Sequence, residues 1–539
     1  SLMYAFAQRS DSTVYDEPLY AHYLVNINPA ALRPYRDEVI KAQNSDGNAV
    51  VNDLICAPSQ RGKVHFFKHM AKHLQKLDHE FLTNTKNVIL CRHPAEVLSS
   101  WSATLGDAQT SVKDIGLDQQ MSLLEILRSM GQEAIVITND TLVRRPEGTL
   151  RALCAALEIE FETAMLKWPK GGRHEDGLWA RYWYHNTHAS TGFSAHSRTN
   201  STPPVLPEPL KSEVELVLPS FEQLRAQQLK PTPVLPDERN RHIWVHVGGL
   251  LLPRSEAKVS VFDSSVQGGD AVWEGLRVYK GKVFALEEHV ERLLNSSRAL
   301  LFDDIPTAVH VKQAVFETLH KNSMYDECHI RLTLTRGEKV TSGMSPTNNQ
   351  SGPCLIVLAE WKPLMDSAGN KVGAMMPQRL ISSSIRRNTP ACLDSKIHHT
   401  NLLNNILAKI QANSAGVDDA LMLDVHGFVS ETNATNFFIV RKGVLITPHA
   451  DACLPGITRQ IVMEIAPELG IKVEERNVSL AEVYSACEAF TTGTMGALVP
   501  VSEIDGRAMT EAVGTVTQRL QEQYVKRVMT LGVAIPPAY

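Results

Sequence analysis

The chain has 539 residues and a net charge of −5, with 43% hydrophobic and 21% charged residues. A chain of this length exceeds one hydrophobic core, so we expect about three or four domains. The acidic balance disfavours nucleic acid and anionic membranes as partners, and no apolar run approaches the roughly 18–20 residues that span a bilayer.

Eight cysteines are scattered along the chain without a C-x-x-C pair. In a protein this large, such a pattern indicates reduced thiols in the core, neither a disulfide framework nor a metal site. We therefore expect a reducing compartment, the cytoplasm, or an organelle if a transit peptide lies upstream. The chain opens at Ser1 without an initiator methionine, which favours a fragment.

Residues 1–229 mix helical and strand patterns. The segment "NVILCRHPAEVLSSW" (87–101) predicts a buried strand, a turn and the start of a helix. A helix-like run covers 211–229, and the Pro-rich residues 230–241 have the composition of an exposed linker.

From His242 the pattern changes to short strands, hairpins and helices. We expect strands at 242–252, 258–262, 329–337, 354–361 and 436–448, a hairpin at 423–431, and helices at 287–301, 401–416 and 456–470. A second half begins near "KVGAMM" (371–376). The pattern predicts two α+β lobes, a small one at 242–365 and a large one at 371–530, with a cofactor cleft between them.

Several segments of this last block occur in the same order as the sequence motifs of a known protein family. They are "GGDAVWEGLRVY" (268–279), "HVERL" (289–293), "LDSKIHHTNLL" (393–403), "GFVSETNATNFF" (427–438), "LPGITRQ" (454–460) and "TTGTMGALVPV" (491–501). Together they resemble the class-IV aminotransferases: the branched-chain aminotransferases, D-amino-acid aminotransferases and aminodeoxychorismate lyases. The resemblance covers about half of the chain and implies fold type IV with pyridoxal 5′-phosphate as cofactor.

The resemblance assigns the cofactor contacts residue by residue. Lys396 in "DSK" matches the lysine that the family links to the cofactor aldehyde, an amine that needs desolvation or nearby positive charge to be uncharged. Glu431 matches the carboxylate that keeps the pyridine nitrogen protonated. Arg292 matches the phosphate arginine, and backbone amides of Ile457 and Thr458, with Gly493 and Thr494, complete the expected phosphate contacts.

Substrate contacts follow from the same resemblance. Met495 and Gly496 match the amides that help to hold the substrate carboxylate, and Trp273 stands where branched-chain members keep an aromatic wall. Arg331 matches an arginine that bacterial branched-chain enzymes use for the side-chain carboxylate of glutamate. These matches imply transamination of a small apolar amino acid with 2-oxoglutarate and glutamate as the partner pair, in a homodimer.

Two features depart from the branched-chain pattern. The family's tyrosine shortly after the lysine is missing, and His398, His399, Thr400 and Asn401 stand there instead. Gln267 and the "NLL" segment resemble the D-amino-acid enzymes. A D-amino-acid transaminase or an aminodeoxychorismate-type lyase therefore remains an alternative, and a catalytically silent binding or scaffold protein is the alternative of another class.

The N-terminal block carries a second resemblance, to sulfotransferase-type α/β P-loop proteins. Arg92 and Ser100 have the spacing of the pair that such proteins use for the 3′-phosphate of their nucleotide, and His69 falls near their catalytic base. The Gly-rich loop that cradles phosphate would lie upstream of Ser1. We therefore expect an impaired or structural module lacking its P-loop strand, and a sulfotransferase with an appended domain as a further alternative.

Overall fold

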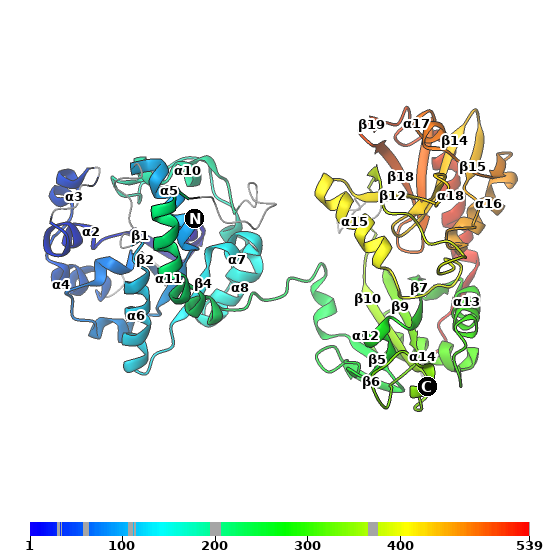
Figure 1. The fold of residues 1–539 in the computed structure, drawn as a ribbon, viewed down its shortest axis with the longest axis horizontal. Coiled ribbons are helices and arrows are strands. Elements are labelled where there is room, and N and C mark those ends of the chain that lie inside the picture. The colour runs from blue at the N-terminus through cyan, green and yellow to red at the C-terminus, as the bar shows by residue number, and fades with distance from the viewer. Residues whose placement is uncertain are drawn as a thin grey trace. The chain divides into compact units, whose positions relative to one another are not determined.

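The computed structural model describes all residues except 30–32, 34, 58–63, 106–111, 113–114, 194–205, 365–375 and 538–539. The chain divides into two compact units, Ser1–Val234 and Leu235–Tyr539, and the division falls within the Pro-rich stretch (Figure 1). Within the described ranges, no helix is both long and apolar enough to cross a membrane. The expected second half at "KVGAMM" begins in residues outside the described ranges.

The N-terminal unit contains two pairs of parallel strands with helices around them. The strands are β1 (Ser12–Asp16) with β2 (Val64–Lys68), and β3 (Val88–Cys91) with β4 (Ile135–Thr138). The larger helices are α5 (Pro94–Leu105), α6 (Leu117–Ser129), α8 (Pro146–Ala156) and α11 (Glu208–Ala226). Parallel strands joined through helices are typical of the expected α/β class.

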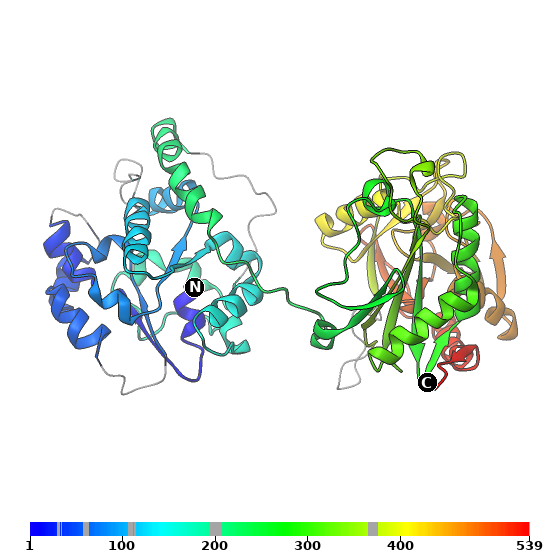
Figure 2. The same ribbon diagram turned by 90° about the horizontal axis from the view of Figure 1, so that it is seen from below.

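The first lobe of the C-terminal unit is built on a seven-stranded sheet in the order β20-β8-β7-β9-β10-β5-β6. Its strands are β5 (Trp244–Val247), β6 (Leu250–Pro253), β7 (Ala271–Tyr279), β8 (Lys282–Phe284), β9 (Cys328–Thr335), β10 (Cys354–Trp361) and β20 (Gly532–Ala534). Helices α13 (Leu286–Ala299) and α14 (Ala308–Lys321) cover one face of this sheet (Figure 2). In α13, Val290, Leu293, Leu294 and Ser297 share one buried face, as the helical period requires.

The second lobe is built on a nine-stranded sheet in the order β13-β12-β11-β18-β17-β14-β15-β16, with β19 beside β18. The strands are β11 (Gln378–Ser382), β12 (Asp419–Leu423), β13 (Val429–Thr432), β14 (Asn436–Arg441), β15 (Val444–Thr447), β16 (Lys472–Glu475), β17 (Glu488–Gly493), β18 (Ala497–Ile504) and β19 (Arg507–Ala508). The helices are α15 (Leu403–Ala415), α16 (Ile457–Glu468), α17 (Leu480–Tyr484) and α18 (Thr515–Thr530). The final strand, β20, leaves this lobe and returns to the first sheet, where it pairs with β8.

Three expected strands differ in the structure. The segment 242–252 is a hairpin, in which β5 pairs antiparallel with β6. Residues 258–262 form no strand, because the chain turns at Ser260–Asp263 and the Asp263 carboxylate then caps helix α12 (Ser264–Gly268). The expected strand at 436–448 is a hairpin, because Lys442 and Gly443 both adopt positive φ, at 49° and 75°. That pair of angles is typical of a two-residue hairpin turn.

Candidate active site

The buried carboxylate of Glu274, on strand β7, organises the site. It accepts hydrogen bonds from Arg292 through Nε (2.7 Å) and Nη2 (2.7 Å) and lies 2.7 Å from Nδ1 of His289 and 3.0 Å from Nδ1 of His398. Although burial acts against ionisation, the surrounding His398 and Arg292 hold the pKa of Glu274 well below its usual range. Glu274 is therefore a carboxylate that fixes three side chains around it.

Arg292 connects this cluster to the start of helix α16. Its Nη1 donates to the carbonyl of Pro455 (2.9 Å), and α16 begins two residues later at Ile457. The N-cap residue of this helix, Gly456, has no side chain to cap the first turn, so the amides of Ile457 and Thr458 point from the helix start as donors of the kind that bind an anion. A Cβ on Gly456 would lie 2.0 Å from Oδ1 of Asn436, which explains the glycine in "LPGIT".

Glu431 lies at the other end of the same network. It is 5% exposed and accepts hydrogen bonds from Nε of Arg387 (2.6 Å) and Nδ2 of Asn436 (3.0 Å). The Asn436 amide also donates to the carbonyl of Leu454, the neighbour of Pro455. Burial raises the pKa of Glu431, and the Arg387 guanidinium opposes that rise. The network thus connects a buried carboxylate at one end to an arginine and a helix start at the other.

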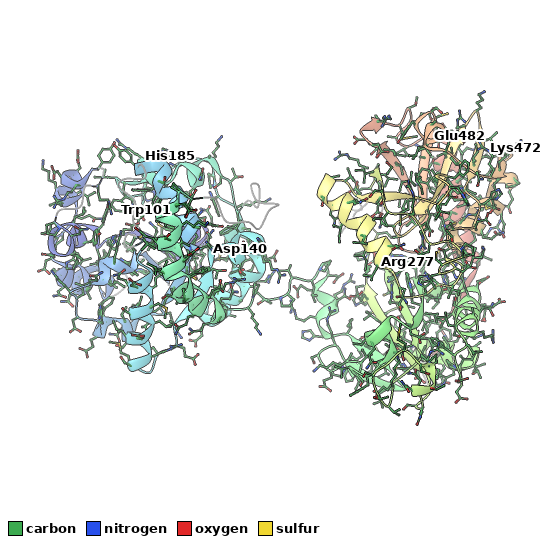
Figure 3. All side chains as sticks on the ribbon, in the orientation of Figure 1. Trp101, Asp140, His185, Arg277, Lys472 and Glu482 are labelled. Carbon is green, nitrogen blue, oxygen red and sulfur yellow. The ribbon has the colours of Figure 1, made fainter. Side chains whose placement is uncertain are left out.

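Two of the substrate residues expected from the sequence, Trp273 on β7 and Arg331 on β9, lie on the face of the sheet opposite to that of Glu274. The guanidinium carbon of Arg331 is 3.6 Å from the centre of the Trp273 ring, which is in turn 4.2 Å from the His398 ring. Met495 and Gly496 belong to the loop between β17 and β18, and the Met495 carbonyl accepts a 3.4 Å hydrogen bond from Arg277 of β7. Figure 3 shows Arg277 where the two lobes meet.

Lys396 does not join these residues. Its side chain is exposed, at the third position of a turn in which the Ile397 amide donates to the Asp394 carbonyl (3.1 Å) and the Lys396 amide donates to the Asp394 side chain (2.9 Å). The desolvation expected for this amine is not found, because the Asp-Ser-Lys sequence forms a solvent-facing turn. The ring and phosphate ends of the site fit pyridoxal phosphate, whereas Lys396 does not fit a covalent anchor.

The sequence reasoning missed two charged members of the site, Glu274 and Arg387. One signal was available for Glu274: a lone carboxylate within the otherwise apolar strand "AVWEGL". A buried charge needs partners, and such a residue usually marks a functional network. Arg387 lies in an irregular segment where no periodicity indicates burial, yet it is only 6% exposed.

Of the three site residues predicted in the N-terminal unit, His69 and Arg92 line the same cavity and Ser100 does not. His69 and Arg92 both line a cavity of about 710 Å³, with walls that include residues of β2 and β3. Burial lowers the pKa of His69 to about 4, and Arg92 forms an ion pair with Glu96 (3.0 Å). Ser100 is exposed on α5 and is not among the residues that line the cavity.

The family models describe both halves of the chain. Residues 271–504 match the Amino-transferase class IV model, and residues 1–212 match the Sulfotransferase domain model. The fold classes expected for the two halves are therefore confirmed. The C-terminal unit is an aminotransferase domain of class IV, the pyridoxal-phosphate-dependent class.

Curated relatives and solved structures agree with these models. Branched-chain-amino-acid aminotransferase-like protein 2 of Arabidopsis thaliana is 49% identical over 99% of this chain and 95% of its own length. A branched-chain-amino-acid aminotransferase of Pseudomonas aeruginosa is 30% identical over 53% of this chain and 92% of its own length. The branched-chain amino acid aminotransferase of Thermobaculum terrenum, solved in its PLP form, is 27% identical and covers 55% of this chain and 100% of its own, with a TM-score of 0.50. The chain therefore belongs to the family of branched-chain-amino-acid aminotransferase-like proteins.

Proposed function

We propose that the C-terminal unit exchanges an amino group between a small apolar amino acid of the branched-chain kind and 2-oxoglutarate, with glutamate as the other amino donor. When bound, pyridoxal phosphate supplies the electron sink for this exchange. Its proposed holding residues are Arg292, Ile457, Thr458, Gly493 and Thr494 for the phosphate, and Glu431 for the ring nitrogen. This assignment is supported by the network that links Glu431 to Arg292 and the start of α16.

The observation that carries the substrate proposal is the Arg331–Trp273 stack. Burial lowers the pKa of Arg331 to about 10, so the guanidinium stays a cation at neutral pH. It makes no hydrogen bond or ion pair with any described residue, and its donors remain open to a carboxylate. Trp273 offers the apolar wall beside it. One site can thereby accept the side chain of glutamate and that of an apolar amino acid in turn.

The exposed position of Lys396 favours a second candidate. A site that retains the phosphate and ring contacts but has no amine of its own fits a binding module with little or no turnover. The D-amino-acid transaminase and lyase alternatives use the same contacts and differ in substrate.

A substrate panel separates these candidates. The purified chain is incubated with pyridoxal phosphate, 2-oxoglutarate and either L-leucine, D-alanine or 4-amino-4-deoxychorismate, and glutamate, pyruvate and the 2-oxo acid from leucine are quantified by mass spectrometry. We expect glutamate and the leucine-derived 2-oxo acid from L-leucine. Turnover of D-alanine or aminodeoxychorismate without turnover of L-leucine would contradict the proposal. Binding of the cofactor without any product would instead support the binding module.

We also propose that the chain acts as a homodimer in the cytoplasm. Helix α15 exposes Leu403, Ile406, Leu407 and Ile410, four apolar side chains at helical spacing, with exposed fractions of 71%, 51%, 47% and 52%. A contiguous apolar face of this kind suits a second copy of the chain. The compartment proposal is supported by the eight cysteines, which are all free thiols.

A further inference from the structure

His398, two positions after Lys396 in the sequence, has its side chain in the site. The segment 398–400 extends along the start of β7: the Trp273 amide donates to the His398 carbonyl (2.9 Å), His399 pairs with Val272, and the Thr400 amide donates to the Ala271 carbonyl (2.9 Å). This pairing places the His398 ring beside both Trp273 and Glu274. The turn at Asp394–Ile397 ends just before it and leaves Lys396 outside.

The partners of His398 define its tautomer. Glu274 is ionised and can only accept, so Nδ1 of His398 must donate across the 3.0 Å contact. Burial lowers the pKa of His398, although Glu274 opposes the effect, and the neutral ring therefore keeps its lone pair on Nε2. No described residue forms a hydrogen bond with Nε2. A carboxylate that fixes one ring nitrogen and leaves the other as a free base is the usual arrangement of a general base.

We propose that His398, and not Lys396, carries protons in this site, and that the chain holds its cofactor without a covalent bond to Lys396. This inference rests on the proposed function, since it concerns the same site. In the proton transfer, Nε2 takes one proton from the substrate and becomes part of an imidazolium whose charge is balanced by Glu274, and it returns that proton later. Retention of the cofactor then depends on the non-covalent contacts proposed above: Arg292, the α16 amides, Gly493 and Thr494 for the phosphate, and Glu431 for the ring nitrogen.

The covalent part is tested by borohydride trapping on the full chain. A lysine amine condenses with the cofactor aldehyde and releases water, and borohydride adds hydride to the resulting C=N bond to give a stable secondary amine. The chain is loaded with pyridoxal phosphate, freed of excess by gel filtration, reduced, digested and mapped by mass spectrometry. We expect bound cofactor at one equivalent before reduction but no modified lysine after it. A modified Lys396, or any other modified lysine at stoichiometric yield, would overturn the inference.

Two substitutions serve as the positive and the negative control for borohydride trapping. His398→Lys puts an amine at the proposed position, and we expect it to gain a borohydride-stable adduct at residue 398. Lys396→Gln is the matched control and should bind cofactor as the wild type does. Loss of cofactor binding in Lys396→Gln would contradict the inference.

The proton-carrying part is tested in His398→Gln, which keeps a hydrogen-bonding side chain of similar size. Deuterium exchange at Cα of L-leucine in the loaded protein is the readout, because it reports proton transfer directly. We expect the exchange rate to fall by about 10²-fold or more with cofactor affinity changed only a few-fold. An unchanged exchange rate would overturn the role of His398. Absence of cofactor binding by the wild type would instead refute the proposed function, so the two failures are distinguishable.

Discussion

The guanidinium carbon of Arg331 lies 3.6 Å from the centre of the Trp273 ring, and Arg331 has no other partner among the described residues. If this cation receives the side-chain carboxylate of glutamate, Arg331→Gln should raise KM for glutamate by about 10- to 100-fold, the value of one hydrogen bond to a charged group. KM for L-leucine should change little, because leucine makes no such bond. Steady-state kinetics with both substrates test this, and an equal loss for both would contradict it. Arg331→Lys is the control, since it keeps the charge but loses the planar stack.

Removing one partner of the buried ion pair between Arg387 and Glu431 should strongly destabilise the C-terminal unit. Both side chains are 6% exposed, and Nε of Arg387 lies 2.6 Å from Oε1 of Glu431. Removing only one partner leaves an uncompensated buried charge, so Arg387→Met should lower the free energy of unfolding by about 3–5 kcal/mol. The double variant Arg387→Met/Glu431→Leu should recover part of that loss. Urea denaturation measures the free energy of unfolding of each variant. A double variant whose loss equals the sum of the losses of the two single variants would contradict the pairing.

Acid should destabilise the C-terminal unit through its buried histidines. Burial lowers the pKa of His329 to about 3 and that of His399 to about 4, against an ordinary value of 6.5. Between pH 6.5 and those values the unfolded chain binds protons that the folded chain does not, so the free energy of unfolding falls as pH falls. His329→Gln should flatten the loss between pH 6.5 and 4, measured by urea denaturation. His426→Gln, at an exposed position, is the control, and an equal flattening in it would contradict the assignment.

The apolar face of α15 should govern oligomeric state. Leu407→Glu places a charge among Leu403, Ile406 and Ile410, and a buried unpaired charge in an interface costs several kcal/mol. We expect the wild type to elute as a dimer in size exclusion with light scattering and the variant to shift to monomer. Val525→Glu, at a 62% exposed position on α18, should stay dimeric. A monomeric wild type would refute the homodimer proposal.

Several parts of the fold were predictable because the signal is local. The amphipathic period of α13 and the hairpin at Asp424–Gly427 both depend on residues close in sequence. The pairing of β20 with β8 was not predictable, because it joins residues about 250 positions apart through a contact that no local pattern encodes.

The site shows the same division. Arg292 and Glu431 are found by motif because each stands at a fixed offset from a helix or hairpin. Lys396 is the counterexample: its neighbours match the family, but the Asp394 turn decides which way its side chain points. His398 was visible in the sequence only as a departure from the family's pattern. Its role emerges from the register of residues 398–400 against β7, a tertiary contact.

The most direct test of the proposed amino-group exchange follows the nitrogen itself. The chain is loaded with unlabelled pyridoxal phosphate and given an excess of L-leucine that carries an isotopically labelled amino group. The cofactor is then released with acid, and its mass is measured by mass spectrometry. We predict recovery of pyridoxamine phosphate that carries the label, with loss of this product in Arg292→Gln. Recovery of unchanged, unlabelled pyridoxal phosphate from a chain shown to bind it would contradict the proposed exchange.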